Sequence, residues 1–147
     1  MNTINPVHGR SAKAGDAAVG GLLHGLAAGL AMAGFLVLAG LAQGQTPASV
    51  LGVFTISGEP KVLAGLLGHL AVAAVYGLVW GVLWRMVGRR VRVPAVVAGL
   101  LYGLLLWGVS QVLVRSIGAQ LALLAPWALL GGHLIYGLVV GFLSRKV

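Results

Sequence analysis

The stretch of sequence that decides the fold is AAVGGLLHGLAAGLAMAGFLVLAGLA, residues 17–42. It contains no Asp, Glu, Lys or Arg. Because an α-helix rises about 1.5 Å per residue, a run of this length exceeds the roughly 30 Å of hydrocarbon in a bilayer. It is also longer than the apolar part of a cleaved signal peptide, which spans about 7–15 residues. The run therefore predicts a transmembrane helix.

Three further apolar runs follow the first. They cover residues 62–84, 94–113 and 124–143, and each is long enough to cross the bilayer as a helix. None of them alternates polar and apolar residues, as a transmembrane β-strand would. The sequence thus predicts an all-α fold, an integral membrane four-helix bundle. A single transmembrane domain is expected over residues 16–147, preceded by a cytoplasmic tail at residues 1–15.

The composition also favours a membrane protein. Hydrophobic residues make up 59% of the 147 residues and charged residues 8%, and the mean hydropathy is +1.01. A water-soluble domain carries about 25% charged residues. Cysteine is absent, which excludes disulfides and thiolate metal sites. The two acidic residues, Asp16 and Glu59, lie outside the predicted spans, and no catalytic motif is present. We therefore expect no enzyme.

The basic residues predict the orientation of the spans. Lys61 and Arg115 would lie on one side of the membrane, and the other eight would lie on the opposite side: Arg10, Lys13, Arg85, Arg89, Arg90, Arg92, Arg145 and Lys146. The positive-inside rule assigns the larger group to the cytoplasm, so both termini are expected there (N-in/C-in). Because the positive charges flank apolar runs, they predict contact with anionic lipid rather than with nucleic acid.

The first connection contains an apolar segment that is too short to span. This segment, SVLGVFTIS at residues 49–57, is bounded by Pro47 and Pro60. It is expected to lie at the outer interface of the membrane. A re-entrant segment is the alternative, and it would require burial against protein.

Small residues recur every four positions in each predicted span, and they predict close helix packing. Residues four apart share a helix face, and small side chains there let two backbones approach closely. We expect either a tight bundle or contacts between copies of the chain. The residues expected to pack are Gly21, Gly25, Gly29, Ala73, Gly77, Gly81, Gly99, Gly103, Gly137 and Gly141.

A short internal repeat links the second and fourth spans. YGLVWGVLWR at residues 76–85 and YGLVVGFLSR at residues 136–145 agree at seven of ten positions. The two spans are expected to run in the same direction. The repeat indicates either a duplicated two-helix unit or convergence on the same packing pattern.

Three histidines fall within predicted spans, and ionisable groups there often mark function. His69 and His133 each begin a small-residue stripe, so both are expected to face other helices; His24 lies nearer the cytoplasmic end. They are candidate ligands for a haem or a pigment. The alternatives are hydrogen bonding across helices, with no cofactor, and a transport role. A metal site is not expected, since carboxylate partners are lacking.

The pattern also predicts positions for one glutamine and three tryptophans. Gln111, near the end of the third span, is expected to meet His69 or His133. Trp80, Trp84 and Trp127 are expected to lie in the interfacial aromatic belts of the membrane.

The chain resembles the uncharacterised four-span bacterial inner-membrane proteins typified by YagU. The resemblance rests on GLLHGLAAGLAMAG at residues 21–34, HLAVAAVYGLVWG at 69–81 and GGHLIYGLVVGFLSRK at 131–146. Gly132-His133-Leu134 is its most distinctive part. It implies a multi-pass protein of the bacterial inner membrane and brings no established chemistry with it.

Three functional hypotheses follow from the sequence. The first is a non-enzymatic membrane protein that acts through helix packing, either as an accessory subunit of a membrane complex or as a homo-oligomer. The second is a helical bundle that binds haem or pigment through its intramembrane histidines. The third is a small channel or transporter.

Overall fold

The structure, a computed structural model, describes residues 8–55, 60–88, 90–117 and 123–146. These residues form four long helices, α1 (His8–Leu41), α3 (Val62–Val87), α4 (Ala95–Ile117) and α5 (Pro126–Leu143). A short helix α2 (Pro47–Gly52) and a 3₁₀ turn η2 (Ser144–Lys146) complete them, and the described part contains no strand. All four long helices are long and apolar enough to cross a membrane. The prediction of an all-helical fold with four helices that could span a membrane is therefore confirmed.

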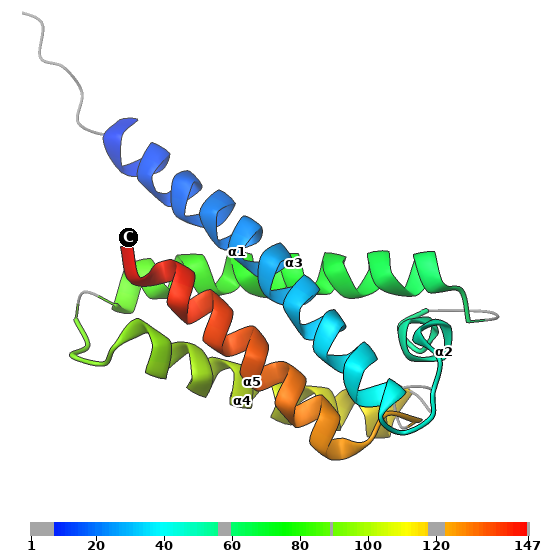
Figure 1. The fold of residues 1–147 in the computed structure, drawn as a ribbon. Coiled ribbons are helices and arrows are strands. Elements are labelled where there is room, and N and C mark those ends of the chain that lie inside the picture. The colour runs from blue at the N-terminus through cyan, green and yellow to red at the C-terminus, as the bar shows by residue number, and fades with distance from the viewer. Residues whose placement is uncertain (1–7, 56–59, 89, 118–122, 147) are drawn as a thin grey trace, which may run out of the picture.

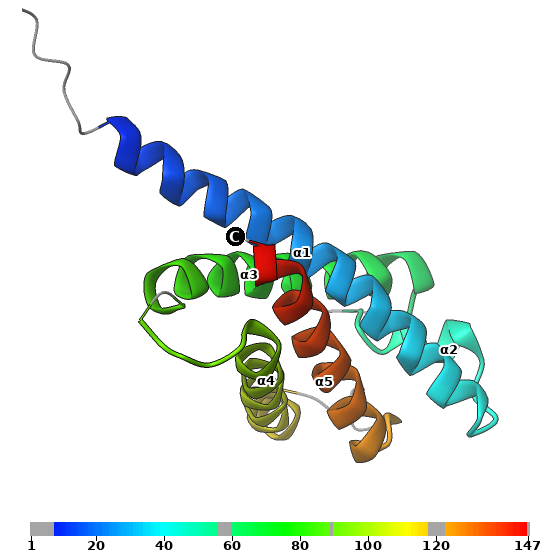
Figure 2. The ribbon, with the colours of Figure 1, turned by 60° about the vertical axis from the view of Figure 1, so that its left-hand side comes forward.

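The four long helices form two crossed pairs. α1 packs on α3, α5 packs on α4, and α1 and α5 lie side by side (Figure 1). α4 is seen nearly end-on in Figure 2 while α3 runs across the view, so these two helices point in different directions. The first turns of α1 project beyond the rest of the bundle in both views. α1 is the longest helix because it begins at His8, well before the apolar run at residues 17–42.

The core of the bundle lies where α1 and α5 meet. Leu36 of α1 and Val140 of α5 are fully buried, and Met32 and Leu129 pack into the same cluster. Small residues on α5 open the space that these side chains fill. A Cβ at Gly132 would lie 3.2 Å from Met32 Cγ, and one at Gly131 would lie 2.8 Å from the tip of the Phe35 ring. The α1–α5 contact is therefore made by large side chains that lie over glycines.

The α1–α3 pair is held by direct contact between backbones. A Cβ at Gly21 would overlap the Gly77 carbonyl oxygen and lie 2.9 Å from Gly81 Cα. A Cβ at Gly25 would overlap the Ala73 carbonyl oxygen and lie 2.7 Å from Gly77 Cα. Only hydrogen fits at these positions, so the two helices touch along their glycine faces.

The α4–α5 pair repeats this contact position by position. A Cβ at Gly99 would overlap the Gly137 carbonyl oxygen and lie 2.8 Å from Gly141 Cα, just as Gly21 meets Gly77 and Gly81. Gly103 meets the carbonyl of His133 in the way that Gly25 meets that of Ala73. The two pairs thus share one packing geometry, which favours a duplicated two-helix unit over chance similarity between two helices.

The first connection folds over one end of the bundle. Gly44, with φ of 75°, turns the chain after α1, and Thr46 caps α2 through hydrogen bonds shared with Ser49. Val50 of α2 is 1% exposed and fits against Gly40, while the Leu51 carbonyl oxygen contacts Gly65. This part of the apolar segment therefore packs against protein. Residues 56–59 of the segment lie outside the described residues.

The matching glycine contacts predict matching sensitivity to substitution. Gly77→Ala and Gly137→Ala should each destabilise the fold by about 1–3 kcal/mol, because the added methyl group forces two backbones apart. Unfolding in a mixed-detergent titration measures the loss. Gly20→Ala is the control, since nothing lies within 4 Å of a Cβ there. Equal stability of all three variants would contradict the backbone contacts.

Candidate functional site: buried polar residues of the bundle

His69 lies on α3 and is 8% exposed. Its Nε2 is 3.0 Å from the Gly29 carbonyl oxygen of α1, so this nitrogen donates the hydrogen bond. The ring of Phe54 covers the imidazole at a centroid distance of 4.7 Å. With Nε2 protonated, the neutral ring keeps Nδ1 as its basic nitrogen.

His133 lies on α5 and is 9% exposed. Its Nδ1 is 2.8 Å from the Leu129 carbonyl oxygen, one turn earlier on the same helix. The neutral ring therefore donates from Nδ1 and keeps Nε2 as its basic nitrogen. The two imidazoles are held by different nitrogens, and each has one left for another partner.

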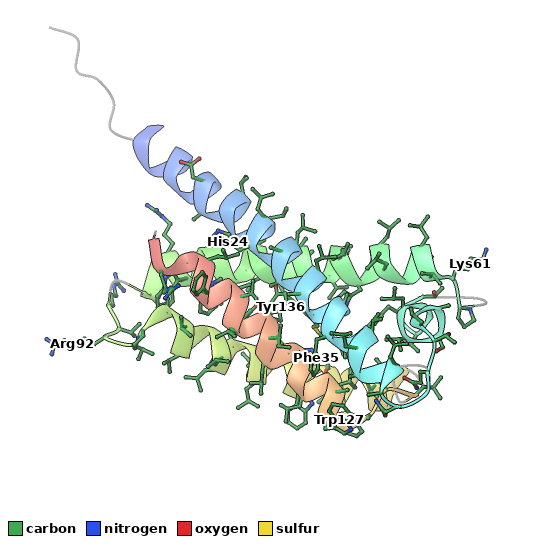
Figure 3. All side chains as sticks on the ribbon, in the orientation of Figure 1. His24, Phe35, Lys61, Arg92, Trp127 and Tyr136 are labelled. Carbon is green, nitrogen blue, oxygen red and sulfur yellow. The ribbon has the colours of Figure 1, made fainter. Side chains whose placement is uncertain are left out.

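A tyrosine links the two helices that carry the buried histidines. The Tyr136 hydroxyl of α5 donates to the Ala73 carbonyl oxygen of α3 at 2.7 Å. His69 precedes Ala73 by one helical turn, and His133 precedes Tyr136 by about one turn on a helix that runs the same way. By the matching glycine crossings His133 corresponds to Ala73, so His69 and His133 lie about one helical turn apart in level on helices that run the same way. Tyr136 itself lies in the middle of the bundle (Figure 3).

His24 does not join this pair. It lies on α1 beside Gly25, in the half of the helix that packs on Gly77, and its side chain is only partly buried. No hydrogen bond from its ring is found among the described residues. Gly29, the α1 residue that meets His69, is more than one turn further along the helix.

Trp80 is a core residue, contrary to the expectation of an interfacial position. It is 4% exposed, and its Nε1 donates to the Ser144 hydroxyl at 2.9 Å. Ser144 in turn donates to the Val140 carbonyl oxygen at 2.7 Å. Trp84 stacks on Trp80 with a centroid distance of 5.3 Å and is partly buried. Trp80 follows Gly77 by three positions, and that register is the signal that would have placed it on the packing face.

Trp127 differs from these two tryptophans. It is 55% exposed and lies at the edge of the bundle (Figure 3), as a residue of an aromatic belt would.

α4 carries polar atoms that find no partner. The side-chain nitrogens Trp107 Nε1 and Gln111 Nε2 are buried, and neither has a hydrogen-bond partner among the described residues. Gln111 was expected to meet His69 or His133, and its amide nitrogen donates to neither. On the same helix the Tyr102 hydroxyl donates to the Tyr76 carbonyl oxygen at 2.9 Å, which ties α4 to α3.

The donor set suits an axial ligand role better than a metal cage. No group of three or more His, Cys, Asp or Glu residues converges among the described residues. Two neutral imidazoles, each with one nitrogen fixed by a backbone carbonyl, match the way ligating histidines are oriented. The same hydrogen bonds also satisfy the rings without any ligand, as polar contacts between and within membrane helices do.

Comparison with known proteins gives no relative from which to transfer a function. No protein-family model, no curated protein and no solved structure matches the chain. The resemblance to YagU-like proteins stays a prediction.

The tyrosine contacts predict different roles for two residues at equivalent repeat positions. Tyr136→Phe should destabilise the bundle by about 0.6 kcal/mol, and by at most about 1.7, because the Ala73 carbonyl loses its side-chain donor. Tyr76→Phe should have a smaller effect, since no hydrogen bond from the Tyr76 hydroxyl is found among the described residues. Detergent titration of both variants compares them, and equal losses would argue against the Tyr136 contact.

Proposed function

We propose that the chain is a non-enzymatic multi-pass protein of the bacterial inner membrane that acts through helix packing. It has both termini in the cytoplasm and serves as an accessory subunit of a membrane complex or as a homo-oligomer. One observation carries this proposal. The two helix pairs have equivalent surfaces, but those of α1 and α5 are buried against each other while those of α3 and α4 are largely exposed.

The glycine stripes pack against other helices of the same chain, so they are not available for contact with a partner. Gly21, Gly25, Gly99 and Gly103 all meet backbone of the same chain. Any contact with another protein must therefore use other faces. α3 and α4 have the larger free surfaces, because 22% of the apolar stretch of each is buried, against 39% for α1 and α5.

The repeat indicates which free surfaces suit a partner helix. Phe35 of α1 packs on Gly131 of α5, next to Gly132. The matching crossings align α1 with α4 and α3 with α5. In this alignment Leu113 of α4 corresponds to Phe35. Ala71 and Val72 of α3 correspond to Gly131 and Gly132. Leu113 is 45% exposed and Val72 is 51% exposed. The contact of a large side chain over small residues is thus formed between α1 and α5, while Leu113 and Val72 stay exposed although Tyr102 links α4 to α3 elsewhere.

A homo-oligomer built on these surfaces would place α4 of one copy against α3 of the next. The chain has no cysteine, so single cysteines report on this without background. We expect Val72→Cys in one copy to form a disulfide with Leu113→Cys in a second, differently tagged copy when membranes are oxidised. Leu38→Cys, at a position 68% exposed on α1, is the matched control.

Two results of this experiment separate the forms of the proposal. Pairing of Val72→Cys with Leu113→Cys above the level of the Leu38→Cys control supports the homo-oligomer. A monomeric chain with no co-purifying protein in mild detergent would contradict both the oligomer and the accessory subunit.

A bundle that binds haem or pigment is the second candidate, favoured by the free nitrogens of His69 and His133. A haem would be held by these two nitrogens and would supply electron transfer. The gently purified chain should then show a visible absorbance band that changes on reduction and is lost in His69→Ala and in His133→Ala. His24→Ala should keep the band. A featureless spectrum of chain purified with added haem would count against this candidate.

A further inference from the structure

The end of the bundle that holds the α3–α4 loop and the C-terminus is strongly basic. Eight of the ten basic residues lie in the segments of the sequence that lead to this end, and Asp16 is the one acidic residue in those segments. Figure 3 shows Arg92 at this end and Lys61 at the opposite end. Carboxylates of the chain therefore cannot neutralise most of this charge.

The duplicated unit delivers two arginines to this end. Arg85 lies in the last turn of α3, and Arg145 follows α5 in η2. They follow Gly81 and Gly141 by the same four positions, and those glycines occupy equivalent places in the two helix crossings. Because α3 and α5 run in the same direction, both arginines reach the same surface of the membrane.

A buried contact joins the two helix ends next to these arginines. Trp80 of α3 donates to Ser144 at 2.9 Å, and Ser144 directly precedes Arg145. Trp84, which directly precedes Arg85, stacks on Trp80. Arg85 and Arg145 each directly follow a residue of this cluster of Trp80, Trp84 and Ser144, and no Asp or Glu side chain among the described residues contacts it.

The guanidinium group of Arg145 is oriented by its own helix end. It lies 3.6 Å from the centroid of the Phe142 ring, and its Nε donates to the Phe142 carbonyl oxygen at 3.2 Å. These contacts occupy Nε and one face of the group, and among the described residues no acceptor is found for its two terminal NH₂ groups. Two parallel N–H donors of this kind match the oxygens of a phosphate group.

Apolar side chains surround the basic cluster on the membrane side. On α3, Met86 is 64% exposed and Leu83 is 46% exposed, and on α5 Phe142 is 54% exposed. A free phosphate ion would gain nothing from these side chains, whereas the acyl chains of a lipid would cover them. The combination fits a molecule with an anionic head and an apolar tail.

We propose that Arg85 and Arg145 bind the phosphate group of an anionic phospholipid, and that Arg90 and Arg92 of the α3–α4 loop strengthen binding by adding positive charge at the same end of the bundle. The lipid lies with its headgroup against the two equivalent arginines and its acyl chains along the exposed faces of α3 and α5. This site is independent of any partner protein and of any cofactor at the histidines.

Lipid titration followed by native mass spectrometry tests the site on the full chain in a neutral detergent. Phosphatidylglycerol should bind more tightly than phosphatidylcholine with identical acyl chains. The double variant Arg85→Gln/Arg145→Gln should weaken phosphatidylglycerol binding roughly thirtyfold and leave phosphatidylcholine binding unchanged. Lys61→Gln, which removes one charge at the opposite end, is the control and should bind as the wild type does.

Three outcomes would overturn the proposal. They are equal affinity for the two lipids, an equal loss in Lys61→Gln, and full competition by an excess of inorganic phosphate, which would indicate a site for the free ion. If the double variant fails to fold, Arg90→Gln/Arg92→Gln takes its place. Those two side chains are exposed on the loop, and their loss should still weaken phosphatidylglycerol binding selectively.

Discussion

The structure depends on the contact between glycine backbones at two helix crossings. Lipid tails are as apolar as leucine, so helices in a bilayer gain little by burying apolar side chains against one another. Close approach of Gly25 to Gly77, and of Gly103 to Gly137, provides van der Waals contact that larger residues would prevent. These crossings fix α1 relative to α3 and α4 relative to α5. The remaining side chains then fill the space between the two pairs.

The contacts between the two pairs differ, although the crossings within the pairs correspond. α1 meets α5 through Phe35 and Met32 lying over glycines, but α3 and α4 carry no glycines at the equivalent positions. α3 and α4 are instead bridged by large side chains, with Tyr102 against Trp80 at 5.2 Å between centroids. Two similar crossings thus coexist with two different contacts between the pairs, and the second leaves more of α3 and α4 exposed.

The four long apolar helices and their small-residue faces could be predicted from sequence because each depends on residues close together in the chain. An apolar run sets a helix, and a four-residue spacing sets a face. The start of α1 at His8 was not predictable in this way, because residues 8–16 are not an apolar run. Their helical turns continue the helix that the apolar residues after them form. Trp80 and Gln111 were misplaced for a different reason. The register of Trp80, three positions after Gly77, already marks the packing face, but its partner Ser144 lies 64 positions further along the chain. The place of Gln111 depends on the direction that α4 takes relative to α3 (Figure 2), which no local pattern sets.

Each buried histidine has two ring nitrogens, and the hydrogen bonds of the bundle use only one of them. An imidazole in hydrocarbon needs a partner for its N–H group, and backbone carbonyls supply it for both His69 and His133. A ligand would use the other nitrogen of each ring, the one without a proton. Structural and ligand-binding roles therefore use different atoms of the same side chain and do not compete. The carbonyl contacts make the histidines tolerable in the bundle, and in doing so they also fix the tautomers in which the remaining nitrogens are basic.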